Sequence, residues 1–167
     1  VLGVALHSLR AVDTGSLADL AALRPGAPIH MHLAETLAEV EQVQAALGQR
    51  PVEWVLQNLD LSSRWCLIHI TQMQPHETRA LARSGAVAGL CPLTEASLGD
   101  GIFDGVTWLG EGGSIALGSD SNIRISLTEE MRQLDTSQRL RDHSRAALAT
   151  ADRSTGRRLL EDAAKGG

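Results

Sequence analysis

Histidine and acidic residues follow the apolar segments of this sequence, at the points where several predicted strands end. His30 and His32 end one segment and are followed by Glu35, His69 ends the next, and Asp120 comes after a later one. A neutral imidazole is a good ligand for zinc, and a carboxylate can complete such a site. The pattern therefore favours a zinc site, although a single histidine at a strand end is more often a hydrogen-bonded structural residue.

The number of histidines at strand ends strengthens that interpretation. The chain contains 6 histidines, and four of them lie at strand ends, including His7 after the first apolar segment. His30 and His32 point to the same face of their strand because side chains repeat every two residues, so one of them could be only a neighbour. The segment Gly118–Ser121, taken alone, is also typical of a turn with an Asx-type hydrogen bond.

Short apolar runs that alternate with helical patterns must position these side chains. Repeated alternation of this kind predicts parallel strands joined by right-handed crossovers, in either a doubly wound sheet or a (β/α) barrel. The carboxyl ends of parallel strands share one rim, which is where barrel enzymes place their chemistry. The predicted strands are residues 1–7, 28–34, 65–71, 86–91 and 114–119.

Periodicity, prolines and glycines predict the helices between the strands. Residues 37–47 carry apolar side chains at helical spacing, and Gly48 is well placed to end that helix. Pro51 and Pro75 are predicted to open two further helices. The remaining predictions are helices over 16–24 and 142–165, a helix that begins with the Ser126 and Glu129 capping box, and a long loop over 92–113.

The composition describes an ordinary globular chain. Its 167 residues are 43% hydrophobic and 21% charged, with a formal net charge of −5, which suggests one domain. No apolar run approaches the ~20 residues that span a bilayer, and the N-terminus lacks the basic flank of a signal peptide. The 2 cysteines and 2% aromatic residues argue against a disulfide scaffold and against a stacking surface for nucleic acid. We therefore expect a cytoplasmic protein with a small-molecule ligand and no nucleic-acid or membrane partner.

A set of short segments carries a family resemblance. His32 after one strand, His69 after the next, and Asp120 in a Gly-Ser-Asp-Ser segment resemble the later half of the amidohydrolase superfamily. Within it, the sequence is most similar to the deiminases that act on N-formimino-L-glutamate, over nearly all of residues 4–140. The segments that carry this similarity are 7–12 (HSLRAV), 30–35 (HMHLAE), 50–54 (RPVEW), 82–92 (ARSGAVAGLCP), 94–96 (TEA), 98–103 (LGDGIF) and 118–121 (GSDS).

The resemblance implies a zinc hydrolase built on a (β/α)8 TIM barrel, of which this chain would supply about the last five strands. It implies that His32 and Asp120 are metal ligands and that Asp120 also accepts a proton from the metal's water. His69 would polarise or deprotonate that water, and Glu35 would carry the proton to the leaving nitrogen.

The resemblance also implies a substrate and a reaction. His7 and Arg10 would hold the substrate, since the Arg10 guanidinium can pair with a carboxylate through two hydrogen bonds. The implied reaction converts N-formimino-L-glutamate and water to N-formyl-L-glutamate and ammonia, a step of histidine breakdown. The resemblance further implies that the full-length enzyme could form a homodimer.

The sequence departs from the family pattern at its start. The only H-x-H motif is His30-Met31-His32, on the segment that matches a later strand, so the family's early H-x-H pair is absent from residues 1–167. The first barrel strands and the small flanking β domain are absent as well. Two of four expected protein ligands would remain, whereas catalytic zinc usually keeps at least three. We expect residues 1–167 to be the C-terminal portion of a barrel enzyme, inactive when isolated.

Three other interpretations stay open at this point. The chain could belong to another deaminase of the same superfamily, acting on guanine or an aminotriazine, although Arg10 favours an acidic substrate and aromatic residues for stacking are scarce. It could be a non-catalytic remnant or an interaction module with an incomplete metal site. It could also be a doubly wound binding domain, which would require His32 and Asp120 to lie far apart.

Overall fold

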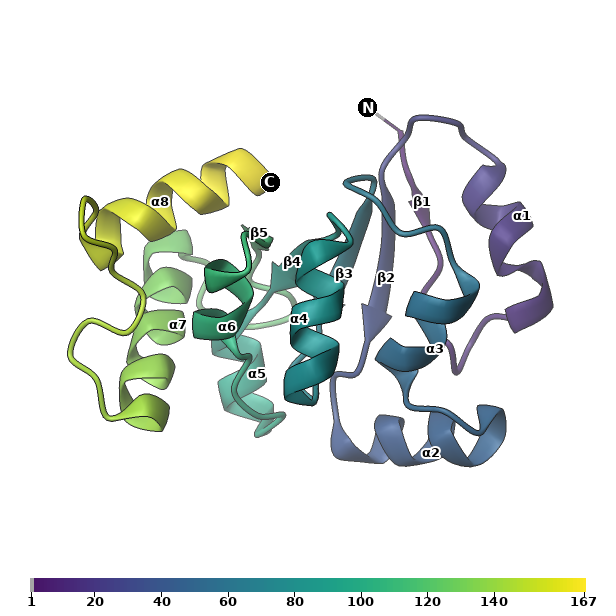
Figure 1. The fold of residues 1–167 in the computed structure, drawn as a ribbon, viewed down its shortest axis with the longest axis horizontal. Helices are drawn as coiled ribbons and strands as arrows, with labels where there is room; N and C mark the ends of the chain where they lie inside the picture. Colours follow the sequence, from purple (N-terminus) through teal and green to yellow (C-terminus); the bar gives the residue numbers. More distant parts are fainter. Residues whose placement is uncertain (1) are drawn as a thin grey trace.

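A five-stranded parallel sheet forms the centre of the computed structural model, which describes residues 2–167 (Figure 1). Each strand pairs with the next one along the chain, in the order β1-β2-β3-β4-β5. All of these pairings are parallel. The strands are β1 (Val4–Ala5), β2 (Ile29–Leu33), β3 (Trp65–His69), β4 (Val87–Leu90) and β5 (Ser114–Leu117).

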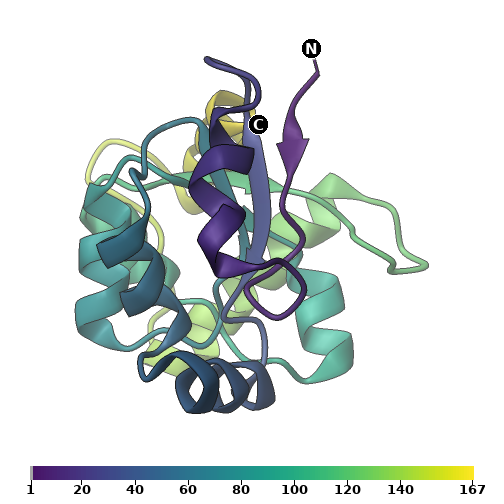
Figure 2. The ribbon, with the colours of Figure 1, turned by 90° about the vertical axis from the view of Figure 1, so that its right-hand side faces the viewer.

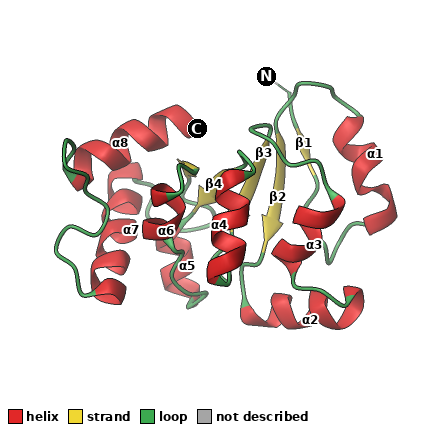
Figure 3. Cartoon of the chain, in the orientation of Figure 1, coloured by secondary structure: helices red, strands yellow, loops and turns green. Residues whose placement is uncertain are grey.

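Prolines and capping side chains set where most of the helices begin, and Figure 3 shows these helices in red. Pro51, Pro75 and Pro92 each open a helix. Proline is well suited to this position because it lacks an N–H, and the first N–H groups of a helix have no hydrogen-bond partner within the helix. The hydroxyls of Thr36 and Ser126 accept a hydrogen bond from the amide three residues on. No helix within residues 2–167 is long and apolar enough to cross a bilayer. The helices are α1 (Leu17–Ala22, after the 3-10 turn Thr14–Ser16), α2 (Leu37–Leu47), α3 (Pro51–Asn58), α4 (Pro75–Arg83), α5 (Pro92–Leu98), α6 (Gly105–Gly110), α7 (Leu127–Asp142) and α8 (Thr155–Gly166).

The sequential strand order decides between the two predicted architectures. In a doubly wound sheet the strand order reverses at a switch point. Here every connection moves one strand in the same direction, so right-handed crossovers place the connecting helices on one face. Figure 2 shows α1, α3 and α4 on the same side of β2 and β3. The prediction of a partial (β/α) barrel with five parallel strands is confirmed, and the doubly wound interpretation is wrong.

Residues 92–113 differ most from the sequence prediction. The stretch predicted as a long loop contains α5 and α6, which begin at Pro92 and after Asp104. The Asp104 carboxylate caps α6 by accepting a hydrogen bond from the amide of Thr107 at 3.2 Å. Both helices are too short to show an apolar period, which explains why the prediction was wrong here. The first predicted strand is also shorter in the structure, and Val1 lies outside the described residues.

The two faces of the sheet differ in burial. Ile29, Met31 and Leu67 point toward the helices and are buried, as the alternation of side chains along a strand requires. His30 is exposed and Cys66 is half-buried at the alternate positions. The helical layer therefore covers one face of the sheet, while the face that would form the interior of a closed barrel remains accessible.

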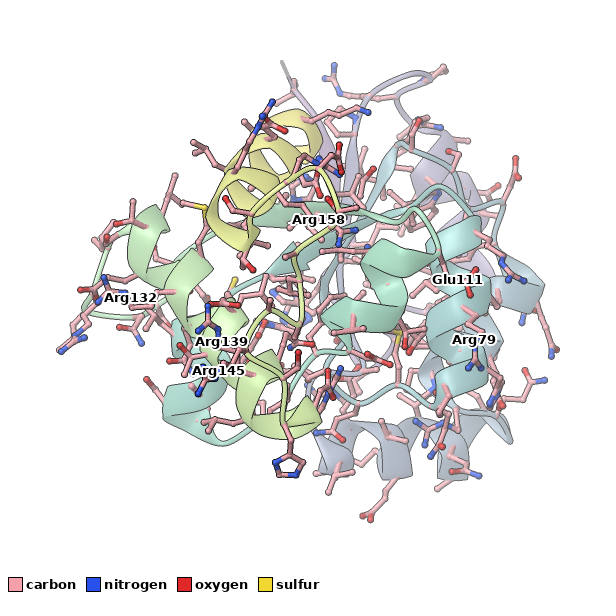
Figure 4. The ribbon with its side chains drawn as sticks, turned by 60° about the vertical axis from the view of Figure 1, so that its left-hand side comes forward. Arg79, Glu111, Arg132, Arg139, Arg145 and Arg158 are labelled. Carbon is pink, nitrogen blue, oxygen red and sulfur yellow. The ribbon has the colours of Figure 1, made fainter. Side chains whose placement is uncertain are left out.

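Arginine side chains connect the outer helices. Arg79 of α4 pairs with Glu111, which follows α6, at 3.9 Å (Figure 4). Arg83 of the same helix pairs with Glu111 at 2.7 Å. Exposed pairs of this kind contribute roughly 0–1 kcal/mol each. Arg158 of α8 instead donates a hydrogen bond to the carbonyl oxygen of Leu109 at 3.0 Å and has a side chain only 12% exposed. Arg158 therefore connects α8 to the C-terminal end of α6 through a largely buried side chain.

We expect the substitution Gly113→Ala to destabilise the fold. A methyl group on Gly113 would lie 2.6 Å from Cε2 of the Trp108 indole ring, which is fully buried. The Trp108 Nε1–H donates to the carbonyl oxygen of Ser114 at 3.0 Å, so a displaced ring would also weaken this hydrogen bond. We expect a loss of about 1–3 kcal/mol in the free energy of unfolding, measured by urea denaturation.

The matched control is Gly110→Ala, at the last residue of α6. Nothing lies within 4 Å of the position that its methyl group would occupy. We expect this variant to unfold at the same urea concentration as the parent chain or slightly above it, because alanine is the better helix former. Equal destabilisation by both substitutions would contradict the packing argument.

Candidate functional site

The carboxyl ends of the strands surround a hollow of about 500 Å³. β2 contributes His30 and His32 to its lining, and the residues just after β1 and β5 contribute His7 and Asp120. The structure therefore brings together side chains that are far apart in the sequence. The lining residues are Ala5, His7, His30, Met31, His32, Ile68, Cys91 and Asp120.

His32 stands at the centre of a row of three imidazole rings. Its ring centroid lies 5.4 Å from that of His7 and 5.7 Å from that of His69. Its Nδ1 lies 2.9 Å from the carbonyl oxygen of His7, so Nδ1 carries the proton in the tautomer that makes this hydrogen bond. That tautomer leaves Nε2 with a free lone pair, the arrangement usual for metal-binding histidines.

His69 is buried between two carboxylates, with only 2% of its surface exposed. Its Nδ1 lies 3.2 Å from Oε1 of Glu95, and its Nε2 lies 3.6 Å from Oε1 of Glu35. Burial by itself would lower the pKa of His69. The hydrogen bond to Glu95 and the charges of Glu35, Glu95 and Asp120 outweigh that effect and raise the pKa above its ordinary value.

Three of the site residues have left-handed backbone conformations. The φ angles of His7, His69 and Asp120 are +51°, +71° and +50°. Non-glycine residues seldom adopt such angles, which cost of order 1–3 kcal/mol and occur mainly where the surrounding structure holds them. Each of these residues lies where a strand turns into the following loop, so the strain marks the rim of the sheet.

The loop that carries Glu35 is fixed by a buried carboxylate. Glu39, in the first turn of α2, accepts hydrogen bonds from the amides of Ala34 and Glu35, each at 2.9 Å. Its side chain is fully buried, and its own amide is capped by Thr36. Glu39 therefore holds the backbone of Glu35 in place beside His69.

The site carries an excess of acidic groups. Asp100 is only 8% exposed, and its Oδ2 is buried without a hydrogen-bond partner. Burial is the main cause that raises the pKa of Asp100, and the charges of Glu35, Glu95 and Asp120 act in the same direction against the opposing effect of His69. Because these carboxylates outnumber the cations around them, the site favours a positively charged ligand.

The structure groups most of the predicted site residues and leaves one apart. His7, His32 and Asp120 line the hollow, and Glu35 and His69 lie beside it. Arg10 lies in the exposed loop after β1 and is not among the lining residues. Sequence reasoning gave no role to Glu95 and Asp100, although both belong to segments that carry the family resemblance.

The donor atoms present fit part of a metal site. His32 and Asp120 line the same hollow, and an imidazole nitrogen and a carboxylate are suitable ligands for zinc. Within residues 2–167, no group of three or more histidine, cysteine, aspartate or glutamate side chains is arranged to hold a metal ion.

The fold and the rim together define a class: a segment of a parallel (β/α) barrel with histidine and carboxylate side chains at its strand ends. Residues 11–153 match the sequence model of the amidohydrolase family, and the chain belongs to this family. The family resemblance predicted from the sequence is thereby confirmed.

Individual relatives agree with this assignment. The chain is 48% identical to formimidoylglutamate deiminase of Pseudomonas aeruginosa, in an alignment that covers 99% of this chain and 37% of that protein. A crystal structure of an amidohydrolase from Brucella melitensis is 50% identical, with a TM-score of 0.96 over 99% of this chain and 37% of that chain. A zinc-bound adenosine deaminase from Xanthomonas campestris shares the fold at 23% identity, with a TM-score of 0.77 over 96% of this chain and 39% of that chain. The chain thus spans little more than a third of the length of these relatives.

We expect Glu39→Ala to destabilise the fold and loosen the loop that carries Glu35. The substitution leaves the amides of Ala34 and Glu35 without their acceptor, and a buried unpaired donor costs about 1–3 kcal/mol. Urea denaturation measures the loss in stability, and hydrogen exchange should become faster at these two amides. Glu41→Ala is the control, because Glu41 is exposed on the same helix. Unchanged exchange at the two amides would contradict the role of Glu39.

Proposed function

We propose that this chain is the C-terminal part of a zinc-dependent barrel enzyme that hydrolyses the formimino group of N-formimino-L-glutamate. The observation that carries the proposal is the placement of His32 and Asp120 on one hollow, with the His69 and Glu35 pair beside it. The identity of 48% to a protein named formimidoylglutamate deiminase supports the choice of reaction.

The chemistry that a bound zinc ion supplies is a water molecule that loses a proton near neutral pH. His32 and Asp120 would be its ligands from this chain, and Asp120 would also accept the proton from that water. The hydrogen bond from His32 Nδ1 to the carbonyl oxygen of His7 keeps the imidazole in the tautomer that a ligand needs.

Glu35 and His69 would handle the protons of the reaction. The water oxygen bonds to the formimino carbon, and the bond from that carbon to the terminal nitrogen then breaks. The departing nitrogen must gain a proton before it can leave as ammonia, and Glu35 is the acid that this step requires. His69 lies 3.6 Å from Glu35, so a proton can pass between the two groups after a small movement. The products are N-formyl-L-glutamate and ammonia.

The charge of the site supports an amidine substrate over a neutral heterocycle. Amidines are strong bases and carry a positive charge in neutral water, which suits a site with Glu35, Asp100 and Asp120. None of the residues that line the hollow in the described chain is Phe or Trp, so this part of the barrel offers no such ring on which a purine could stack. Arg10 would bind a carboxylate of the substrate if the loop after β1 turned toward the hollow.

A hybrid enzyme tests this proposal. In the hybrid, residues 1–167 replace the matching part of the Pseudomonas aeruginosa deiminase, which supplies the rest of the barrel. We expect zinc-dependent release of ammonia from N-formimino-L-glutamate. The substitution Glu35→Gln should lower kcat about 10²–10⁴-fold, as expected for a lost general acid.

The control for the hybrid is Glu41→Gln, an exposed position on α2, which should leave kcat and KM unchanged. His32→Ala should lower the zinc content of the purified hybrid, measured by elemental analysis. A folded, zinc-loaded hybrid that deaminates adenosine-type substrates and leaves N-formimino-L-glutamate intact would overturn the substrate assignment.

We expect the isolated 167-residue chain to bind zinc weakly and to release no ammonia. His32 and Asp120 supply two ligands, whereas catalytic zinc usually keeps at least three from the protein. Calorimetric titration with zinc should show weak binding to the parent chain and still weaker binding to Asp120→Asn, which keeps only one of the two ligands. Ammonia release by the isolated chain that requires zinc and disappears in Asp120→Asn would contradict this expectation.

A further inference from the structure

Glu95 is a buried carboxylate that the proposed chemistry does not use. It lies on α5, is 3% exposed, and touches two groups with the same oxygen. Oε1 accepts a hydrogen bond from the amide of Cys91 at 2.8 Å and lies 3.2 Å from Nδ1 of His69. One atom therefore connects the start of α5 to the histidine at the end of β3.

We propose that Glu95 is the positioning residue of His69: its carboxylate fixes the proton on Nδ1 and so directs an unprotonated Nε2 toward Glu35. This inference deepens the proposed function, on which the role of His69 rests. A charged carboxylate is a stronger acceptor for an imidazole N–H than a neutral oxygen is. A hydrogen-bond partner on one ring nitrogen decides which tautomer the ring adopts.

The geometry leaves His69 little other choice of orientation. Its ring stacks on that of His32 with an interplanar angle of 23°, and its backbone is held at a φ of +71°. Stacking fixes the plane of the ring but does not distinguish one nitrogen from the other. The hydrogen bond to Glu95 makes that distinction, because it places Nδ1 on the α5 side and Nε2 on the side of Glu35.

Two other buried glutamates of the chain have hydrogen-bond partners that are typical of a purely structural role. Glu39 accepts hydrogen bonds only from backbone amides, and Glu130 accepts one from the amide of Leu93 at 2.8 Å. Glu95 has a backbone partner of this kind and a site histidine in addition. The question for experiment is whether Glu95 controls His69 or only caps α5.

Nitrogen NMR of the 167-residue chain, labelled with ¹⁵N at its histidines, shows which ring nitrogen of His69 carries the proton. The spectrum is recorded at a pH high enough for the rings to be neutral, and the His69 signals are assigned from their loss in His69→Gln. We expect a protonated Nδ1 and an unprotonated Nε2 in the parent chain. In Glu95→Leu, which has no acceptor, the Nε2 signal should shift toward the protonated position. Glu95→Gln keeps an acceptor oxygen and should retain the parent tautomer.

The matched control is Glu130→Leu. Glu130 lies on α7, and its buried carboxylate accepts a hydrogen bond from the amide of Leu93 in the first turn of α5, with no histidine partner among the described residues. This variant should leave the His69 signals unchanged. A parent chain with the proton on Nε2, or a folded Glu95→Leu chain with the parent tautomer, would overturn the proposal. If Glu95→Leu does not fold, the tautomer of the parent chain alone decides the outcome.

Kinetics in the hybrid enzyme separate this proposal from the proposed function. Glu95→Leu should lower kcat about 10–100-fold with little change in KM, because Glu95 positions His69 and does not touch the substrate. A hybrid without deiminase activity but with the expected tautomer would contradict the reaction and leave the positioning role intact. A larger effect on KM than on kcat would count against positioning.

Discussion

Buried glutamates near the starts of helices hold the strand ends of this protein in place. Glu39 binds the two amides that follow β2, Glu77 binds the amide of Gln74 and the guanidinium of Arg50, and Glu95 binds the amide of Cys91. A buried charge is costly unless it is hydrogen-bonded, and these carboxylates obtain their partners only when the loops have this conformation. Each glutamate therefore makes its loop rigid, and the rigid loops carry the candidate site.

The sequence predicted the features that depend on local chemistry. Pro51 and Pro75 open helices because proline fixes its φ angle at a helical value, and Gly48 ends a helix because glycine adopts the left-handed conformation without steric cost. The convergence of His32 and Asp120 follows from parallel strands alone. The helix α5 was missed because it buries Pro92, Thr94 and Glu95 in place of an apolar stripe. The contact between Glu95 and His69 joins residues 26 positions apart and leaves no periodic signal in the sequence.

The face of the sheet that carries the candidate site is accessible in this structure. His30 and Asp120 are exposed although they line the hollow, and the segment after Asp120 exposes Ile123 and Ile125 at 98% and 84%. Neighbouring apolar side chains that are exposed together are typical of a surface that contacts another surface. A closed barrel would cover this side of the sheet and would surround the hollow with the side chains of further strands. The same closure would lower the effective dielectric around His32 and Asp120 and strengthen their interaction with a cation.

Glu35 and His69 handle the protons of the proposed reaction. Each of them is held in place by a residue that need not touch the substrate. Glu39 fixes the backbone of Glu35 from α2, and Glu95 fixes the ring of His69 from α5. The two held groups face each other at 3.6 Å, slightly beyond hydrogen-bond distance. Because both supports are helix-borne and buried, the separation is set by the packing of the barrel rather than by attraction between Glu35 and His69. A pair held slightly apart in this way can transfer a proton without trapping it, which is what a shuttle to a leaving nitrogen requires.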